Sequence, residues 1–598
     1  MTTKATVGAT RAAAAQTARH LRSLLPQRAD WEAVKRSPGR DIIAGVTVAV
    51  VALPLALAFG VASGLGAQAG LMTAIIAGAL AAIFGGSNLQ VSGPTGAMTV
   101  VLVPVVYRFG VEGVLLTGLM AGVMLLIMAV SRMGKYVRLL PTSLIEGFTA
   151  GIAVVIVLQQ FPNIFGLAPG NEEKVWSLAW QSFLEFIAAP NPVPVIFALV
   201  VAAVILIGAR WMPIIPFTLI MVVVATAAAE LMPWALPRIG ELPSGFNSVS
   251  LAFFDLNRMG DLLPSALAIA ALAALESLLC ATVADSMSVG EQHDPDRELF
   301  GQGLANLVAP MFGGVPATAA IARTAVNVRA GARSRLASVS HAAVLALIVL
   351  FGTDLVSKIP LAALAGVLLA VSVQMIEFGS IRALLTSTRT DAVVLLLTFA
   401  VTVAIDLVTA VVVGLAVAVL LILRSIAKSA KLEQVPLETD PGDSAKERSL
   451  LAERIVAYRL DGPLFFGVAH RFLLELTEVA TVDVVILRMS RLTTLDATGA
   501  RILDDAIKRL EKRGIIVLAS GVQPEHTRLL RGLGVASHLR TMGRVFPDTP
   551  AAIAYARALL AEKAAAKPRT GSIPTVTAAT AAEPTVAEPP DSSDQRGS

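Results

Sequence analysis

Fourteen apolar runs between residues 43 and 424 constrain this chain more than any other feature of its sequence. Most approach the length at which a helix crosses the hydrocarbon core of a bilayer, about 30 Å or about 20 residues. With 55% hydrophobic and 15% charged residues among 598, the chain is too apolar for an ordinary soluble protein. We therefore expect a multi-pass α-helical membrane protein. The runs lie at 43–62, 69–84, 94–107, 112–130, 142–161, 194–209 and 212–232, then at 262–283, 298–312, 318–328, 336–351, 361–377, 390–405 and 407–424.

The basic residues between the runs favour this division into seven plus seven. If the basic N-terminus, residues 1–40, is cytoplasmic, the loops on the same side hold most of the Lys and Arg. An odd number of segments in each half makes residues 41–232 and 262–428 run in opposite senses, as an inverted repeat. We expect a cell-membrane protein with both termini cytoplasmic. The net charge of +5 then reflects membrane orientation, and no nucleic acid is expected as a partner.

Two similar breaks interrupt the apolar runs. Phe84-Gly85-Gly86 leads into Ser92-Gly93-Pro94-Thr95-Gly96, and Phe312-Gly313-Gly314 leads into Pro316-Ala317-Thr318-Ala319. The runs that follow, 94–107 and 318–328, are too short to span a bilayer, so extended backbone supplies the rest. Such backbone is tolerated at membrane depth only where protein buries it or it lines a wet cavity. Paired breaks of this kind indicate the binding site of a transporter.

The short helices that follow the breaks are suited to bind a small oxyanion. A helix N-terminus carries about half a positive charge and up to four N–H groups without helical partners. Hydroxyl groups could add donors, small residues would let the ligand approach the backbone, and an aromatic ring could form an apolar wall. Alternatively, the breaks are helix kinks packed against neighbouring helices, and the aromatic ring belongs to the hydrophobic core. The candidate residues are Phe59, Ser92, Thr95, Gly96, Thr318, Ala319 and Ala320.

Two charged residues lie within apolar runs. A carboxylate at the bilayer centre costs about 2.5 to 3.5 kcal/mol, so Glu276 should be protonated much of the time or face water. Such a group can carry a proton; alternatively it is hydrogen-bonded between helices. Arg323, five residues after Thr318, could attract the anion or replace a cation, or it pairs with Glu276 or snorkels to the membrane surface.

A separate domain follows the apolar region. A polar linker at 429–452 precedes alternating strands and helices at 453–562, which predict a small α/β fold. Thr498, between a strand and a helix, is a candidate for phosphorylation because a helix N-terminus stabilises added phosphate. An ordinary helix cap explains a hydroxyl residue at this position equally well. The tail, 563–598, has little to bury and is expected to be disordered.

Other polar residues do not suggest catalysis or a cofactor. No nucleophile and base occur at a catalytic spacing, and no nucleotide-binding glycine motif follows a strand, so an enzyme is not expected. The acidic stretch Glu291–Glu298 could hold a metal, but we expect a solvated cytoplasmic loop. Cys280 and His341 have no ligand partner at a suitable spacing and are expected to pack, so no metal site is predicted.

Several motifs together resemble the sulfate permease (SulP) family, also called solute carrier family 26, from Asp41 to about Leu560. The resemblance implies core and gate domains, a cytoplasmic STAS domain, homodimers, and an anion bound between the third and tenth segments. The motifs are Ala52-Leu53-Pro54 to Phe59, Val91-Ser92-Gly93-Pro94-Thr95, Ile269 to Asp285, Gly301-Gln302-Gly303-Leu304-Ala305-Asn306, and Phe312 to Thr324.

Within that family the chain resembles the proton-coupled bacterial branch that moves dicarboxylates. At the positions of Glu276 and Cys280, the resemblance implies an Asp and a Thr in sodium-coupled bicarbonate transporters. This difference weighs against sodium binding. The resemblance implies a proton-coupled transporter of sulfate or a small dicarboxylate that works by an elevator-like movement. The alternatives are a sodium-dependent bicarbonate transporter of the same fold, and a membrane-anchored signalling protein whose STAS domain binds a cytoplasmic partner.

Overall fold

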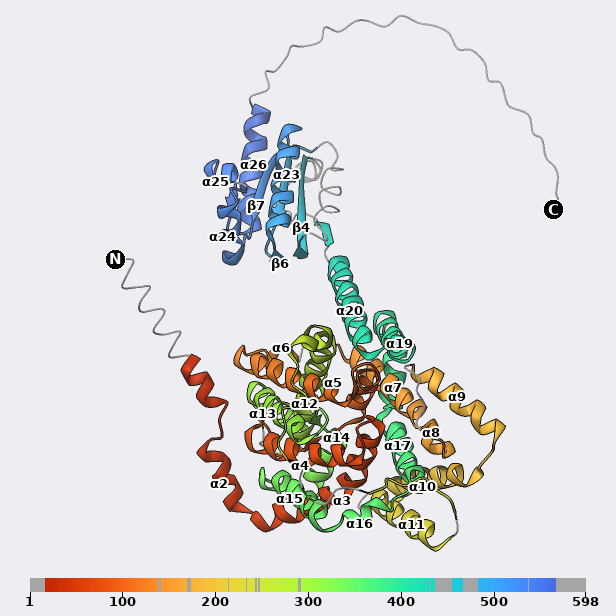
Figure 1. Cartoon of the computed structure of the whole chain (residues 1–598). Helices are drawn as coiled ribbons and strands as arrows, with labels where there is room; N and C mark the ends of the chain where they lie inside the picture. Colours follow the sequence, from red (N-terminus) through yellow and green to blue (C-terminus); the bar gives the residue numbers. More distant parts are fainter. Residues whose placement is uncertain are drawn as a thin grey trace, which may run out of the picture. The chain divides into compact units, whose positions relative to one another are not determined.

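The chain forms two compact units, residues 1–421 and 422–598, in the computed structural model (Figure 1). Each is described by itself. The structure describes residues 17–137, 141–168, 174–212, 215–232, 234–241, 245, 248–288, 292–429, 431–435, 454–465, 482–535 and 537–565. The predicted tail therefore lies outside the described residues after Ala565, where helix α26 ends.

Every predicted apolar run coincides with helix in the structure. The helices of the first half are α3 (Pro38–Ala62), α4 (Ala67–Phe84), α5 (Gly96–Val130), α7 (Thr142–Gln159), α8 (Phe161–Phe165), α10 (Pro192–Trp211) and α11 (Phe217–Leu231). Those of the second half are α12 (Met259–Met287), α13 (Pro295–Val308), α14 (Ile321–Arg329), α15 (Leu336–Phe351), α17 (Leu361–Met375), α19 (Arg389–Ala404) and α20 (Leu407–Ser429).

Helix α5 combines two predicted runs. It is continuous in hydrogen bonding, but Gly110 has φ 69° and ψ −170°, a conformation that side chains with a Cβ rarely adopt. The runs 94–107 and 112–130 are thus separate helical pieces joined at this glycine. Several short helices were not predicted because their sequences are amphipathic or brief: α6 (Gly134–Val137), α9 (Val175–Ala188), α16 (Thr353–Ser357) and α18 (Phe378–Ser387).

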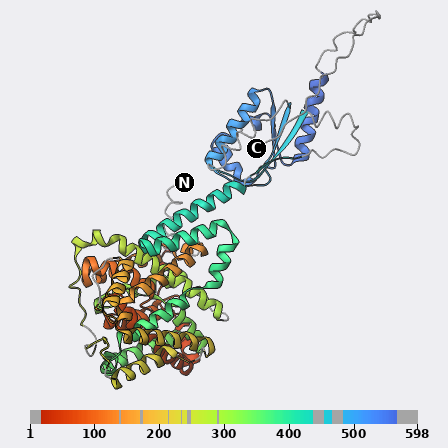
Figure 2. The same ribbon diagram turned by 90° about the vertical axis from the view of Figure 1, so that its right-hand side faces the viewer.

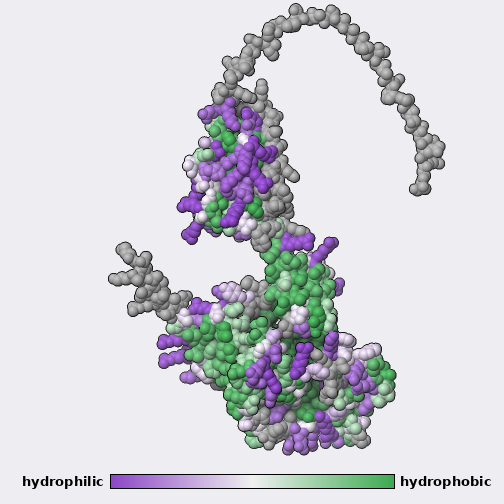
Figure 3. Space-filling model, turned by 45° about the horizontal axis from the view of Figure 1, so that its top comes forward, coloured by the Kyte–Doolittle hydropathy of each residue, from purple (hydrophilic) through white to green (hydrophobic). Residues whose placement is uncertain are grey.

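Eight of the described helices are long and apolar enough to cross a bilayer by themselves, and α11 and α15 are shorter apolar helices. Many large apolar side chains of residues 17–421 are exposed, and the face drawn in Figure 3 shows wide hydrophobic areas beside hydrophilic ones. A helix of a soluble protein would turn such a face inward. This unit is therefore a multi-pass membrane domain.

The membrane helices pack as two groups. One contains α3, α4, α5 and α12 to α15, which contact one another extensively; the other contains α7 to α11, α17 and α19. Fewer contacts join the groups, mainly through α17 and α11 against α3 and through α7 against α5. The turned view in Figure 2 shows these helices stacked in one compact body.

The second unit is a sheet covered by helices on both faces. Its strands are β3 (Lys431–Val435), β4 (Ile455–Leu464), β5 (Val484–Arg488), β6 (Leu492–Leu495), β7 (Ile516–Ser520) and β8 (Val545–Phe546). The order is β3-β4-β5-β7-β8, antiparallel between β3 and β4 and parallel elsewhere, while β6 pairs with β4. Strand β3 lies in the range expected as linker, 429–452.

Alternation along β5 explains the two helical layers. Val485 and Leu487 pack with α23 (Ala497–Lys512), α24 (Pro524–Gly532) and α25 (Ser537–Thr541), whereas Val484 and Ile486 pack with α26 (Thr549–Ala565). Successive side chains of a strand point to opposite faces. The predicted small α/β domain thus has its own core.

Candidate anion-binding site

The two predicted breaks meet in the membrane domain. Ser92–Gly93 (β1) and Thr318–Ala319 (β2) form a two-stranded antiparallel ladder, with Ser92 opposite Ala319. The N–H of Ala320 donates to the Val91 carbonyl at 3.0 Å. Each strand leads within three residues into a helix, so α5 and α14 both start beside the ladder. The pairing satisfies backbone groups that a helical break would otherwise leave open.

Polar side chains of α13 hold this ladder in place. The Asn306 amide donates to the Ala317 carbonyl and accepts from the Ala317 N–H, both at 2.8 Å. The Gln302 amide nitrogen donates to the Ser92 hydroxyl at 2.7 Å and to the Glu298 carboxylate at 3.0 Å. Both amides are fully buried. Glu298, Gln302 and Asn306 are not among the site residues predicted from the sequence. They recur every four residues, a spacing that places them on one helix face.

Glu298 anchors the first break from the other side. Its carboxylate accepts from the N–H groups of Gly86 at 2.9 Å and Ser87 at 3.3 Å, just after α4 ends. The side chain is 2% exposed, so the expectation of a solvated loop is wrong here. Arg297 and His293 are also buried. Arg297 and Glu298 lie in the first turn of α13, which Asp294 caps, and packing of this helix against α4 and α5 removes them from water; His293 directly precedes the cap.

Arg323 joins the second short helix to the first break. Its Nη2 donates to the Pro94 carbonyl, and the side chain is only 1% exposed. A Cβ on Gly93 would lie 2.5 Å from Arg323 Nη1, which explains the glycine. Among the described residues no ion pair joins Arg323 to Glu276, and burial excludes snorkelling to the membrane surface. Arg323 therefore places a buried positive charge beside the residue that precedes Thr95.

Glu276 contacts the start of α5 from helix α12. The Thr95 hydroxyl donates to the Glu276 carboxyl at 3.1 Å, and Thr95 is the residue from which α5 begins. Next to it, the hydroxyls of Ser277 and Thr318 lie 3.0 Å apart. Thr95 and Thr318 are buried, whereas Glu276 and Ala320 are half-buried. The two threonines are thus less exposed than Glu276 and Ala320.

Phe59 also reaches this site. A Cβ on Gly96 would lie 3.3 Å from the Phe59 ring and 2.4 Å from Ile156 Cδ1, so the first residue of α5 is enclosed by apolar side chains. Phe59 is itself buried in the main core. The ring lies beside the start of α5 and packs in the core; its role as a wall of a binding site stays a prediction.

Cys280 and His341 lie in the same group of helices. The Cys280 thiol donates to the Thr324 hydroxyl at 3.1 Å, and that hydroxyl accepts from the Val91 N–H at 3.0 Å. This contact ties α12 and α14 to the first break. His341 is fully buried on α15 close to Gly78 and Gly45.

The remaining candidate, Thr498, belongs to the other unit. It is exposed in the first turn of α23. Asp496 caps this helix, because its carboxylate accepts from the Gly499 N–H at 2.6 Å. The cap is thus supplied by Asp496, and the hydroxyl of Thr498 is open to solvent.

The starts of α5 and α14 place positive and acidic groups close together. The first amides of α5 and α14 have no partner within their helices and carry the positive end of the helix dipole. Arg323 adds a buried positive charge at the Pro94 carbonyl, and the Glu276 carboxyl accepts from the hydroxyl of the next residue, Thr95. N–H groups of the two helix starts and the nearby hydroxyls are donors suited to a small oxyanion, while Phe59 and Ile156 supply apolar surface beside Gly96.

Two protein-family models match this chain. The model of the "Sulfate permease family" matches residues 39–398, and that of the "STAS domain" matches residues 451–552. "Putative sulfate transporter YvdB" of Bacillus subtilis is 34% identical over 83% of this chain and 94% of its own length. "Bicarbonate transporter BicA" of Picosynechococcus is 32% identical over 85% of this chain and 92% of its own.

A solved structure shows the same fold. That of SLC26A9 has a TM-score of 0.75 and 18% identity, and the match covers 89% of this chain and 92% of the other. The named relatives are transporters, so this protein is a transporter and not an enzyme. The family model covers more than half of the chain, and the chain therefore belongs to the sulfate permease family, with a STAS domain at its C-terminal end.

Proposed function

We propose that this protein takes up sulfate or a small dicarboxylate together with protons, and that the anion binds at the starts of α5 and α14. Glu276 is the proton carrier in this scheme. The observation that carries the proposal is the Thr95 hydroxyl bonded to the Glu276 carboxyl at 3.1 Å, because it places a titratable group directly at a helix start.

Electrostatics explains how this contact could couple the two ions. When Glu276 is ionised, its charge lies beside the helix start and repels an entering anion. When it is protonated, the helix dipoles and Arg323 are left without that counter-charge, which favours anion binding. Anion and proton would then load together and leave together. Ser92, Thr95, Gly96, Thr318, Ala319, Ala320 and Phe59 line the proposed site.

An elevator-like movement suits the packing of the membrane helices. The ladder, Glu276 and Arg323 all belong to the group made of α3 to α5 and α12 to α15. This group would form the core domain and the other group the gate. Sliding of one against the other would expose the same site to each side. Fourteen crossings as an inverted repeat, cytoplasmic termini and a homodimer are further parts of the proposal.

Uptake into proteoliposomes tests the coupling. We expect radiolabelled sulfate or a dicarboxylate to accumulate when the outside is made more acidic than the inside, and less when the gradient is collapsed by an ionophore. Accumulation that is indifferent to the pH gradient would remove proton coupling but leave anion transport in place.

Sodium-dependent bicarbonate transport is the second candidate. The observation in its favour is the 32% identity to BicA, which is named a bicarbonate transporter. Against sodium binding, Cys280 presents a thiol bonded to Thr324, and thiol sulfur is a poor ligand for a hard cation. Replacement of sodium by choline should leave uptake unchanged; loss of uptake would favour this candidate.

A signalling role for the STAS domain is compatible with transport. We propose Thr498 as a phosphorylation site that controls a cytoplasmic partner, since its hydroxyl is exposed at the start of α23. Phosphate at a helix start is stabilised by the dipole and the free amides. Mass spectrometry of the protein purified from its host, with Thr498→Ala as the control, tests this assignment.

A further inference from the structure

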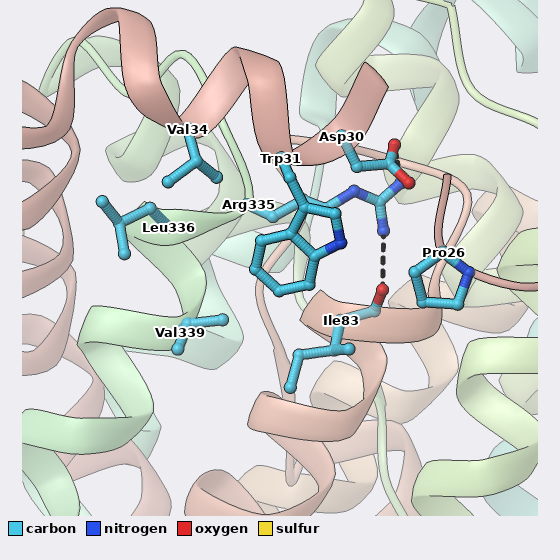
Figure 4. A pocket seen from close by; sticks show the side chains of 8 residues that line it. All are labelled: Pro26, Asp30, Trp31, Val34, Ile83, Arg335, Leu336 and Val339. Atoms are coloured by element: carbon cyan, nitrogen blue, oxygen red, sulfur yellow. Dashed lines mark hydrogen bonds and ion pairs between the residues drawn. The ribbon is translucent and has the colours of Figure 1, made fainter. Parts of the chain in front are cut away.

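A short helix near the N-terminus covers a hollow on the membrane domain. Helix α2 (Arg28–Arg36) lies over α4 and the start of α15, and the hollow beneath it has a volume of about 90 Å³. Its apolar lining includes Trp31 and Val34 of the helix, and Ile83, Leu336 and Val339 of the membrane domain (Figure 4). The side chains in Figure 4 leave an apolar space between α2 and α15.

Buried ion pairs hold α2 in this place. Asp30 accepts from Arg297 Nη2 at 2.6 Å and lies 3.3 Å from Arg335 Nη2. Arg335 Nη1 in turn donates to the carbonyls of Ala82, Ile83 and Gly85 at the end of α4. The helix is thus fixed to α4, α13 and α15, and the hollow is a built feature of the fold.

The outer surface of this region is basic. Asp30 and Asp41 are turned inward, where Asp41 accepts from the N–H of Arg333 at 2.7 Å. Glu32 is then the one exposed acid between residues 28 and 40. The exposed basic residues beside it are Arg28, Lys35, Arg36, Arg40 and Arg333.

The same region adjoins the lipid-facing surface. Trp31 is 53% exposed, and Ile42, Ile43 and Val46, on the first turns of α3, are exposed apolar side chains. Exposed Trp and basic residues next to an apolar helix face are typical of the level of the phospholipid headgroups. The hollow therefore opens near the boundary between lipid and water.

We propose that the hollow and its basic rim bind an anionic phospholipid of the surrounding bilayer, with an acyl chain between Trp31 and Val339 and the headgroup phosphate on Lys35, Arg36 and Arg40. Charge complementarity selects an anionic lipid, and the apolar lining selects its chain. This site is separate from the anion site at the helix starts and does not depend on the proposed transport.

Native mass spectrometry of the full chain tests the proposal. The protein, in detergent, is given equal amounts of phosphatidylglycerol and phosphatidylcholine with chains of different mass. We expect phosphatidylglycerol to be retained preferentially, and the double variant Lys35→Glu/Arg36→Glu to lower its retention about tenfold or more, since each basic residue near a membrane contributes on the order of 1 kcal/mol. Lys512→Glu/Arg528→Glu, which changes exposed basic residues of the C-terminal unit equally, should have no effect.

A second variant tests the hollow itself. Val339→Phe should fill the space and reduce lipid retention while leaving α2 in place, which protease resistance of residues 28–36 reports. Equal retention of both lipids, or equal loss in the control pair, would overturn the proposal. Increased lipid retention after removal of residues 1–16 would also overturn it, because it would show that this segment of the chain occupies the hollow.

Discussion

Glu276 is the residue on which the proposed coupling depends. It lies half-buried on α12, and its carboxyl accepts from the Thr95 hydroxyl at the start of α5. Glu276→Gln keeps the shape and a hydrogen bond to Thr95 but fixes the charge at zero. We expect anion binding to be retained and proton-driven accumulation to be lost, measured as sulfate or dicarboxylate binding and as uptake under a pH gradient. A mutant that still accumulates anion against its gradient would show that another group carries the proton.

Gln302 is a positioning residue for the same site. Its amide connects the Ser92 hydroxyl of the ladder to the buried carboxylate of Glu298. Gln302→Met keeps the volume but removes both hydrogen bonds and leaves Glu298 with fewer donors, a loss of about 1–3 kcal/mol. We expect a lower midpoint of thermal unfolding and a higher KM for uptake. An unchanged KM in a folded variant would mean that Ser92 does not act in binding.

The ladder between β1 and β2 is the element that joins the two halves. Gly93→Ala would bring a Cβ against Arg323 Nη1, so we expect the ladder to shift and uptake to fall strongly. Gly379→Ala, in α18, is the matched control, because nothing lies within 4 Å of the added methyl group. In a helix that change should be neutral or stabilising by about 0.5–1 kcal/mol. Equal behaviour of the two variants would contradict this view of the ladder.

Helix α2 depends on an ionised Asp30. Burial by itself would raise the pKa of Asp30, but the hydrogen bonds from Arg297 and Gln27 and the charge of Arg335 lower it below its ordinary value of 3.8. A lowered pKa in the docked state stabilises docking fully above the ordinary pKa, and this contribution is lost as the pH falls through the lowered value. Docking should thus be unchanged between pH 7 and 5.

Asp30→Asn imitates the protonated state at neutral pH. We expect faster hydrogen exchange in residues 28–36 of this variant, because Arg297 and Arg335 lose their charged partner. Glu32→Gln, an exposed acid of the same helix, is the control and should exchange like the parent. Equal exchange in both variants would show that apolar contacts alone hold the helix.

At the scale of the whole molecule, the two units have separate cores. The membrane domain packs around residues of α3 to α17, while the C-terminal unit packs on the two faces of its own sheet. We expect a protein lacking residues 431–598 to remain folded and to transport at a measurable rate, as judged by uptake in proteoliposomes. Complete loss of uptake from a folded truncated protein would show that the STAS domain is part of the transport cycle.

Local hydropathy and glycine patterns were sufficient to predict most elements. Each apolar run became helix, the succession of strands and helices at 453–562 predicted the small α/β domain, and the two glycine-rich breaks marked where helix must stop. Strands β3, β6 and β8 were missed because they are short and their hydrogen bonds come from distant partners. The match to the sulfate permease family confirmed the class of transporter that the motifs had indicated.

The sequence by itself determined that this is a membrane protein with paired helical breaks, because apolar runs and glycines act over neighbouring residues. The tertiary structure decided how the breaks meet: that Ser92 pairs with Ala319, that Arg323 bonds to Pro94 and not to Glu276, and that Glu298 is buried. These contacts join residues more than 200 positions apart in the chain, as with Gln302 and Ser92. The pairing of distant groups depends on packing of whole helices, which no local pattern encodes.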